Sequence, residues 1–85
     1  MAQTHFEWDA EKDKANQRKH NVSFLQAQYA FADPRRVIAR DLEHSASEER
    51  FYCFGRVKGC VLTVRFTWRR EAIRIFGAAT GAKAE

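Results

Sequence analysis

Cysteine, proline and long apolar runs are scarce in this sequence. Its 85 residues include two Cys and one Pro. Two cysteines are too few for a disulfide framework, and Cys53 and Cys60 have neither CxxC nor Cys/His zinc spacing. No segment approaches the roughly 20 apolar residues that span a bilayer, and the N-terminus lacks the basic and apolar regions of a signal peptide. We therefore predict a cytoplasmic protein with no membrane partner.

The motifs of several common enzyme classes are also missing. The sequence contains no Walker loop, dinucleotide fingerprint, HExxH, GxSxG or Ser/His/Asp arrangement. The histidines His5, His20 and His44 have no mutual spacing that suits a set of metal ligands. We therefore expect neither a cofactor nor a metal site.

Positive charge is what the sequence has in excess. Lys and Arg number 15 against 11 Asp and Glu, which gives a formal net charge of +4 and a pI near 9.4. This balance predicts an acidic partner. Nucleic acid is the commonest such partner, while the ribosome, an acidic protein and an anionic membrane also fit.

Two short helices are predicted near the N-terminus. Asp9 precedes a run of helix formers with an acidic start and a basic end, so a first helix is expected over residues 10–20. Asn21 ends it, because Asn tolerates the left-handed conformation that follows many helices. Ser23 then starts a second helix, which ends before Asp33-Pro34. One face of this second helix is apolar and consists of Phe24, Ala27 and Phe31.

Strands are predicted in the rest of the chain, at 35–41, 50–57, 60–68 and 72–78. Lys58-Gly59 and Arg69-Arg70 are expected to join the last three as tight turns. The chain is short enough to form one domain over residues 1–85, with residues 78–85 as a mobile tail. These elements predict an α+β fold in which two helices pack on one face of an antiparallel sheet of about four strands.

The Lys58-Gly59 turn predicts the register of the central strands. It pairs Val57 with Cys60 and places apolar residues or Gly opposite one another along one face. Continued through Arg69-Arg70, the register pairs Phe66 with Ile73. Both cysteines are expected to be free core thiols, since they do not face each other. The predicted core face contains Phe51, Cys53, Leu62, Val64, Phe66, Ile73 and Ile75.

The same register places arginines on the opposite face of the sheet. Arg50 is expected opposite Thr67, and Arg65 between Tyr52 and Arg74. Like charges across a ladder are destabilising, so the two arginines need an acidic neighbour, solvent or a ligand. Two interpretations stay open: a solvated face whose arginine stems cover phenylalanines, or a phosphate-binding platform with the tyrosine available for base stacking.

The first helix carries a basic stripe. Such a stripe is usually solvated surface, and a histidine at a helix C-terminus is stabilised there when protonated. The stripe therefore points to a site only if other observations agree. Its residues are Lys12, Asn16, Lys19 and His20.

Several segments of the chain, taken in order, resemble the BrnT toxin family. The match runs over about residues 6–77, and the combination of RKHxVSF with FADP is specific. The matching residues are FEWD at 6–9, Lys12, Asn16, RKHNVSF at 18–24, FADP at 31–34, His44-Ser45, Glu49-Arg50, Thr67, Arg69 and RI at 74–75.

The resemblance implies a RelE-like fold, ribosome-independent RNA cleavage and a BrnA-like antitoxin that binds the toxin and represses their shared operon. The DNA-binding domain belongs to the antitoxin in that family. Direct DNA binding by this chain is not expected, because its second helix carries no Lys or Arg for phosphate.

The leading hypothesis is a metal-independent endoribonuclease. A 2′-hydroxyl of the RNA attacks its own phosphate while the protein supplies a base, an acid and positive charge. The expected catalytic residues are Lys19, Arg50, Arg65 and Arg74 as phosphate ligands, with His20 or Glu49 for proton transfer. Further RNA contacts are expected from Lys12, Tyr52, Thr67 and Arg69.

Two positions depart from the family pattern. Asn21 replaces a Gly and can adopt the same backbone conformation. Ala79 stands where the family has an Arg at the end of the last strand, and the basic C-terminal helix is replaced by FGAATGAKAE from Phe76. The alternative hypothesis is therefore a catalytically weak or inactive protein that binds antitoxin or RNA.

Overall fold

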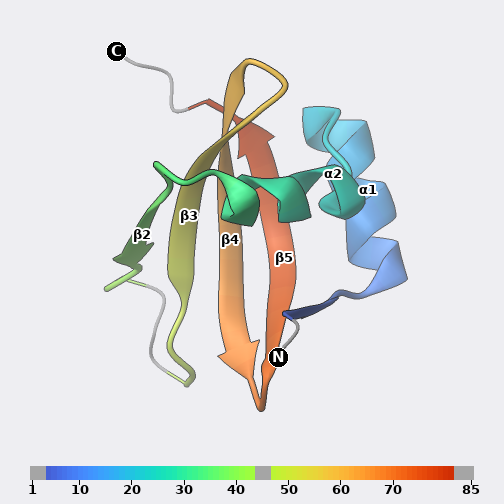
Figure 1. Cartoon of the computed structure of the whole chain (residues 1–85). Coiled ribbons are helices and arrows are strands. Elements are labelled where there is room, and N and C mark those ends of the chain that lie inside the picture. Colours follow the sequence, from blue (N-terminus) through green and yellow to red (C-terminus); the bar gives the residue numbers. More distant parts are fainter. Residues whose placement is uncertain (1–3, 44–46, 82–85) are drawn as a thin grey trace.

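The computed structural model describes residues 4–43 and 47–81, which form a sheet with helices on one face and at one edge (Figure 1). The sheet has five strands in the order β1-β5-β4-β3-β2. β1 pairs with β5 in parallel, and the other pairs are antiparallel. The elements in chain order are β1 (His5–Glu7), α1 (Ala10–His20), α2 (Phe24–Ala27), the 3-10 helix η1 (Gln28–Ala32), β2 (Val37–Arg40), β3 (Phe51–Val57), β4 (Cys60–Arg69) and β5 (Ala72–Thr80).

The α+β class is confirmed, but the expected sheet of about four antiparallel strands is wrong. The sheet is mixed, because His5–Glu7 forms an additional strand beside β5. Three residues are too few to show the alternation by which a strand is recognised in a sequence. β5 also continues to Thr80, so residues 78–80 belong to the sheet and not to a tail, and residues 82–85 lie outside the described part.

Both helices begin at the predicted caps. The Asp9 carboxylate accepts hydrogen bonds from the backbone N–H groups of Glu11 and Lys12 at 2.8 and 3.1 Å, and these bonds lower the pKa of Asp9. Asn21 ends α1 with a left-handed φ of 59°. The Ser23 hydroxyl caps α2, which is short because the chain tightens into η1.

Asn16 fastens α1 to the edge of the sheet, and it is the buried residue of that helix. Its Nδ2 donates to the carbonyl oxygens of Val22 and Ala78, each at 2.8 Å. Its Oδ1 accepts from the Ala78 N–H at 3.2 Å. The side chain thus bonds both peptide groups of one β5 residue, as a neighbouring strand would.

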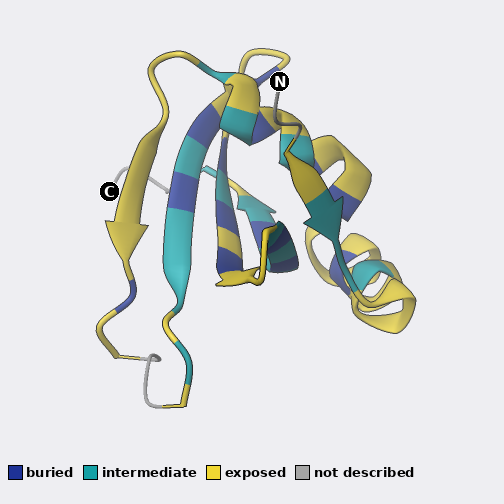
Figure 2. Ribbon diagram, turned by 60° about the horizontal axis from the view of Figure 1, so that its bottom comes forward, coloured by how far each residue is buried: buried dark blue, intermediate teal, exposed yellow. Residues whose placement is uncertain are grey.

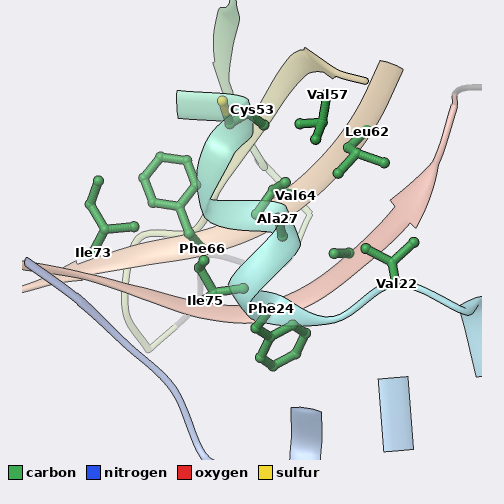
Figure 3. Close-up of a cluster of buried hydrophobic side chains, with 12 residues drawn as sticks. Val22, Phe24, Ala27, Cys53, Val57, Leu62, Val64, Phe66, Ile73 and Ile75 are labelled. Atoms are coloured by element: carbon green, nitrogen blue, oxygen red, sulfur yellow. The ribbon is translucent and has the colours of Figure 1, made fainter. Parts of the chain in front are cut away.

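The core lies between α2, η1 and the sheet, as Figures 2 and 3 show. Phe24, Ala27 and Ala30 from the helical layer are fully buried. Gly55 allows the close approach of η1, because a Cβ at this position would lie 2.2 Å from the Ala30 carbonyl oxygen. The predicted core face is confirmed: Cys53, Leu62, Val64, Phe66, Ile73 and Ile75 are buried, and Phe51 is partly buried against them.

The two cysteines differ in their surroundings. Both are free thiols, as predicted. Burial raises the pKa of Cys53 to about 11, so its thiol stays protonated in the core. The expectation that Cys60 is a core residue is wrong. Cys60 follows the Lys58-Gly59 turn and is exposed.

The register of β3 with β4 is as predicted, but that of β4 with β5 is not. Val57 pairs with Cys60 and Tyr52 with Arg65. The second turn is Arg70-Glu71, so Thr67 and not Arg65 faces Arg74. A β-bulge then places Gly77 opposite Arg65. The predicted core face is still correct at Phe66. Its observed partner, Ile75, lies two positions beyond the predicted Ile73, and side chains two positions apart in a strand point to the same face.

No helix within residues 4–43 and 47–81 has both the length and the apolar character needed to cross a membrane.

We expect Asn16→Ala to lower the free energy of unfolding by about 3 kcal/mol, because several buried backbone groups lose their partner. The loss should appear although Ala is the better helix former. Urea denaturation followed by circular dichroism measures it. Gln17→Ala, at an exposed position of the same helix, is the control and should change stability by less than about 0.5 kcal/mol. Equal stability of the two variants would contradict the role given to Asn16.

Candidate functional site

A hollow of about 390 Å³ lies where α1 meets the sheet face opposite the core. Asn16 determines its position, because this residue holds α1 against β5 and the basic residues lie three and four positions away on the same side of the helix. Lys12, Lys19 and His20 line the hollow from α1, Thr63 and Arg65 from β4, and Phe76, Gly77, Ala78 and Ala79 from β5. Three predicted site residues of α1 therefore meet a fourth that is far from them in the sequence: Lys12, Lys19 and His20 line the hollow together with Arg65.

The β5 bulge shapes the sheet wall of the hollow. Gly77 lies opposite Arg65, and a Cβ on Gly77 would be 3.4 Å from the Arg65 Nε. The missing side chain leaves room for Arg65 to extend across β5. Its guanidinium carbon lies 5.4 Å from the centre of the Phe76 ring, within the range of a cation–π contact.

Arg50 shares the same aromatic ring. Its guanidinium carbon lies 4.8 Å from the centre of Phe76. Both cationic groups thus contact one ring, whose negative faces attract them. Guanidinium groups attract anions, and their planar forked donors suit a phosphate.

Tyr52 lies beside Arg65 in the sheet register, on the same face. Its ring stacks with that of Phe54 at a centroid distance of 5.8 Å. Burial, followed by the nearby Asp41 carboxylate, raises the pKa of Tyr52 above its usual value of 10.0. The phenol therefore stays protonated at neutral pH.

Arg74 has the acidic partner that the predicted register lacked. Its Nη1 lies 3.2 Å from Oε2 of Glu7, which belongs to β1. The predicted contact with Arg65 is wrong, because the strand pairing puts Arg74 opposite Thr67. The ion pair was not predicted because Glu7 belongs to β1, a strand that was not predicted either.

Three other predicted site residues have partners away from the hollow. The Thr67 hydroxyl is buried and donates to the Glu49 carbonyl oxygen at 2.6 Å. The Glu49 carboxylate pairs with Arg40 at 2.7 Å, and Arg69 lies 3.7 Å from Glu48. None of these described residues lines the hollow.

Sequence reasoning missed the site roles of Thr63, Phe76 and Gly77. A glycine inside a strand pattern often marks a bulge, so Gly77 carried a usable signal. Phe76 was expected on the outer face beneath arginine stems, because it follows Arg74 by two positions; what the sequence did not show is that Arg50 and Arg65 share its ring. In the described ranges, no group of three or more His, Cys, Asp or Glu side chains is arranged to hold a metal ion.

Comparisons with known proteins identify chains with a similar sequence pattern and a similar fold. The family model described as ribonuclease toxin, BrnT, of type II toxin–antitoxin system matches residues 8–85. Among solved structures, the crystal structure of the ribonuclease toxin BrnT from Brucella abortus is similar, with a TM-score of 0.74 and 16% sequence identity. The alignment covers 95% of this chain and 100% of that one, so the two share a fold. No curated protein matches the sequence.

We expect Arg74→Gln to lower the free energy of unfolding by less than about 1 kcal/mol, because partly exposed ion pairs contribute little. The Arg74 and Glu7 side chains are 29% and 41% exposed. A double-mutant cycle with Glu7→Gln, read by thermal denaturation, gives the coupling energy. Arg69→Gln is the control, with a longer ion pair to Glu48. A rise in melting temperature for Arg74→Gln would instead indicate relief of repulsion.

Proposed function

The chain belongs to the BrnT family of ribonuclease toxins of type II toxin–antitoxin systems, and on this basis we propose that it is an endoribonuclease that cleaves RNA in the hollow beside α1. The observation that supports the proposal is the meeting of Lys12, Lys19 and His20 with Arg65 at one hollow. The positive charge suits a phosphate, and histidine is the side chain that most often transfers protons in enzyme active sites. The active unit is one toxin domain over residues 1–85 with a RelE-like fold.

The proposed reaction is a transesterification within the RNA. The 2′-oxygen attacks the adjacent phosphorus, the bond to the 5′-oxygen breaks, and a 2′,3′-cyclic phosphate and a 5′-hydroxyl result. Neutral His20 accepts the proton of the 2′-hydroxyl. A protonated lysine of the hollow, Lys12 or Lys19, gives a proton to the leaving 5′-oxygen. Arg65 and Arg50 stabilise the charge that develops on the phosphate.

Four predicted site residues have a smaller part in this proposal than the sequence predicted, namely Glu49, Arg74, Thr67 and Arg69. Each already has a partner elsewhere in the fold. We assign proton transfer to His20 in preference to Glu49, whose carboxylate is paired with Arg40. Cleavage by this route needs no metal ion, because side chains supply the positive charge. Activity that is lost in EDTA and restored by a divalent cation would overturn that part.

We further propose that the toxin acts in the cytoplasm and is neutralised by a BrnA-like antitoxin that covers the hollow. An acidic antitoxin surface would suit the cationic residues gathered there. Growth arrest on expression should be relieved when the antitoxin gene is expressed as well. An antitoxin bound only to the face of the molecule that α2 and η1 cover would contradict the idea that it blocks access to the hollow.

We expect Arg65→Gln to weaken RNA binding, because one phosphate contact is lost. Each 1.4 kcal/mol of lost interaction corresponds to an increase of about tenfold in Kd. The dependence of log Kd on log salt should become shallower by about one phosphate contact. Fluorescence anisotropy with a labelled RNA, at several salt concentrations, measures both. Arg36→Gln is the matched control, because it removes the same charge from an exposed residue near Tyr29 and Ile38, outside the hollow. Equal losses in both variants would mean that only net charge matters.

The alternative function, a weak or inactive member that binds antitoxin or RNA, rests on Ala79. This residue lines the hollow where the family resemblance leads one to expect an Arg. We expect Ala79→Arg to tighten RNA binding and raise the cleavage rate, by up to about tenfold for 1.4 kcal/mol of added phosphate interaction. The rate of cleavage of a labelled RNA is the measurement. An unchanged rate would show that an arginine at this position is not what limits activity.

A further inference from the structure

Two aromatic rings lie on the open face of the sheet, next to the proposed phosphate site. Tyr52 and Phe54 are two residues apart on β3, so both side chains point to the same face. Their rings are nearly parallel, at an interplanar angle of 23°. Both are half-buried, and the helices α2 and η1 pack on the other face of the sheet. RNA can therefore approach the rings from the open face. Because the rings stack on each other, a base can use the ring face that is turned away from the partner ring.

The strand register puts the rings directly beside the hollow. Tyr52 pairs with Arg65 and Phe54 with Thr63, and both partners line the hollow. Neighbouring strands are about 4.8 Å apart. The Arg65 guanidinium lies over Phe76 on β5, so about two strand spacings separate a phosphate held there from β3, a distance that the base of that nucleotide or of its neighbour can span.

The residues around the rings leave them accessible. On the β2 side, Tyr52 pairs with Ala39, a small residue, and Phe54 pairs with Val37, which is itself exposed. On the other side, the Arg65 side chain extends across Gly77 toward Phe76. The Tyr52 ring is itself fixed by Phe54 and by the Asp41 carboxylate. A rigid aromatic surface flanked by positive charge is the combination with which proteins bind unpaired bases.

We propose that Tyr52 and Phe54 form a base-stacking platform that selects single-stranded RNA. Both faces of a base inside a duplex are already stacked, so a paired strand cannot use the platform without unpairing. Stacking on an aromatic ring accepts every base, which makes the selection one of strandedness and not of sequence. The inference rests on the proposed RNA cleavage and adds the class of RNA that is cut.

The test uses the full-length protein and a labelled 2′-O-methyl RNA of about 12 nucleotides, within the usual site size of single-strand binders. The 2′-O-methyl groups block attack on the phosphate, so binding is measured without cleavage. The same strand is tested alone and annealed to its complement. The wild type should bind the single strand at least about tenfold more tightly than the duplex.

Phe54→Leu removes the ring but keeps an apolar side chain, so the sheet should still fold. We expect it to weaken single-strand binding about tenfold, to leave duplex binding unchanged and to leave the salt dependence as in the wild type. Tyr52→Leu should behave in the same way. Tyr29→Leu, an exposed aromatic on the helical side, is the control and should change neither affinity. A thermal melt of each variant confirms that it is folded.

The outcomes separate the platform from the ribonuclease. Equal affinity for single strand and duplex, or equal behaviour of Phe54→Leu and Tyr29→Leu, overturns the platform. Cleavage of an unmodified RNA that is lost in His20→Ala then still supports the proposed function. A wild-type protein that neither binds nor cuts RNA overturns both proposals.

Discussion

The hydrogen bonds between Asn16 and Ala78 are the constraint on which the arrangement of this protein depends. Packing alone does not determine where along a sheet edge a helix lies. Here one amide side chain bonds both peptide groups of a β5 residue and also the carbonyl of Val22. The helix is thereby fixed in position and in rotation about its axis. The basic residues of α1 face the sheet for this reason, and the hollow exists because of it.

The bulge in β5 is the second determinant, because it decides where cationic side chains collect. Alternation from Ile75 puts Phe76 on the open face, and the bulge then puts Gly77 opposite Arg65 and returns Ala78 to the core. Arg50 and Arg65 both contact the Phe76 ring, which attracts each guanidinium group. Each of these steps contributes to the positive wall that the proposed RNA site requires.

Local signals made much of the fold predictable from the sequence. Capping residues delimit α1, and the two-residue Lys58-Gly59 turn determines the register of β3 with β4. The β4–β5 register was not predictable in the same way, because Arg69, Arg70 and Glu71 are all charged and any adjacent two of them can form the turn. Arg70 adopts the left-handed conformation, with a φ of 60°, which is uncommon for arginine and is therefore not expected from the sequence. The candidate residues Lys19 and Arg65 were identified from the sequence, but their meeting depends on the position of α1 and was not predictable.

The contact between α1 and β5 also has a consequence for the moment at which the protein acquires its site during synthesis. Asn16 and Ala78 are 62 positions apart, and β1 likewise pairs with β5 at the other end of the chain. The helix is made well before the strand edge that receives it. While the ribosome still holds β5, the basic residues of α1 have no sheet wall to face. The hollow is therefore assembled only after β5 has been made and has paired with the rest of the sheet, so a nascent chain that ends before β5 lacks the site.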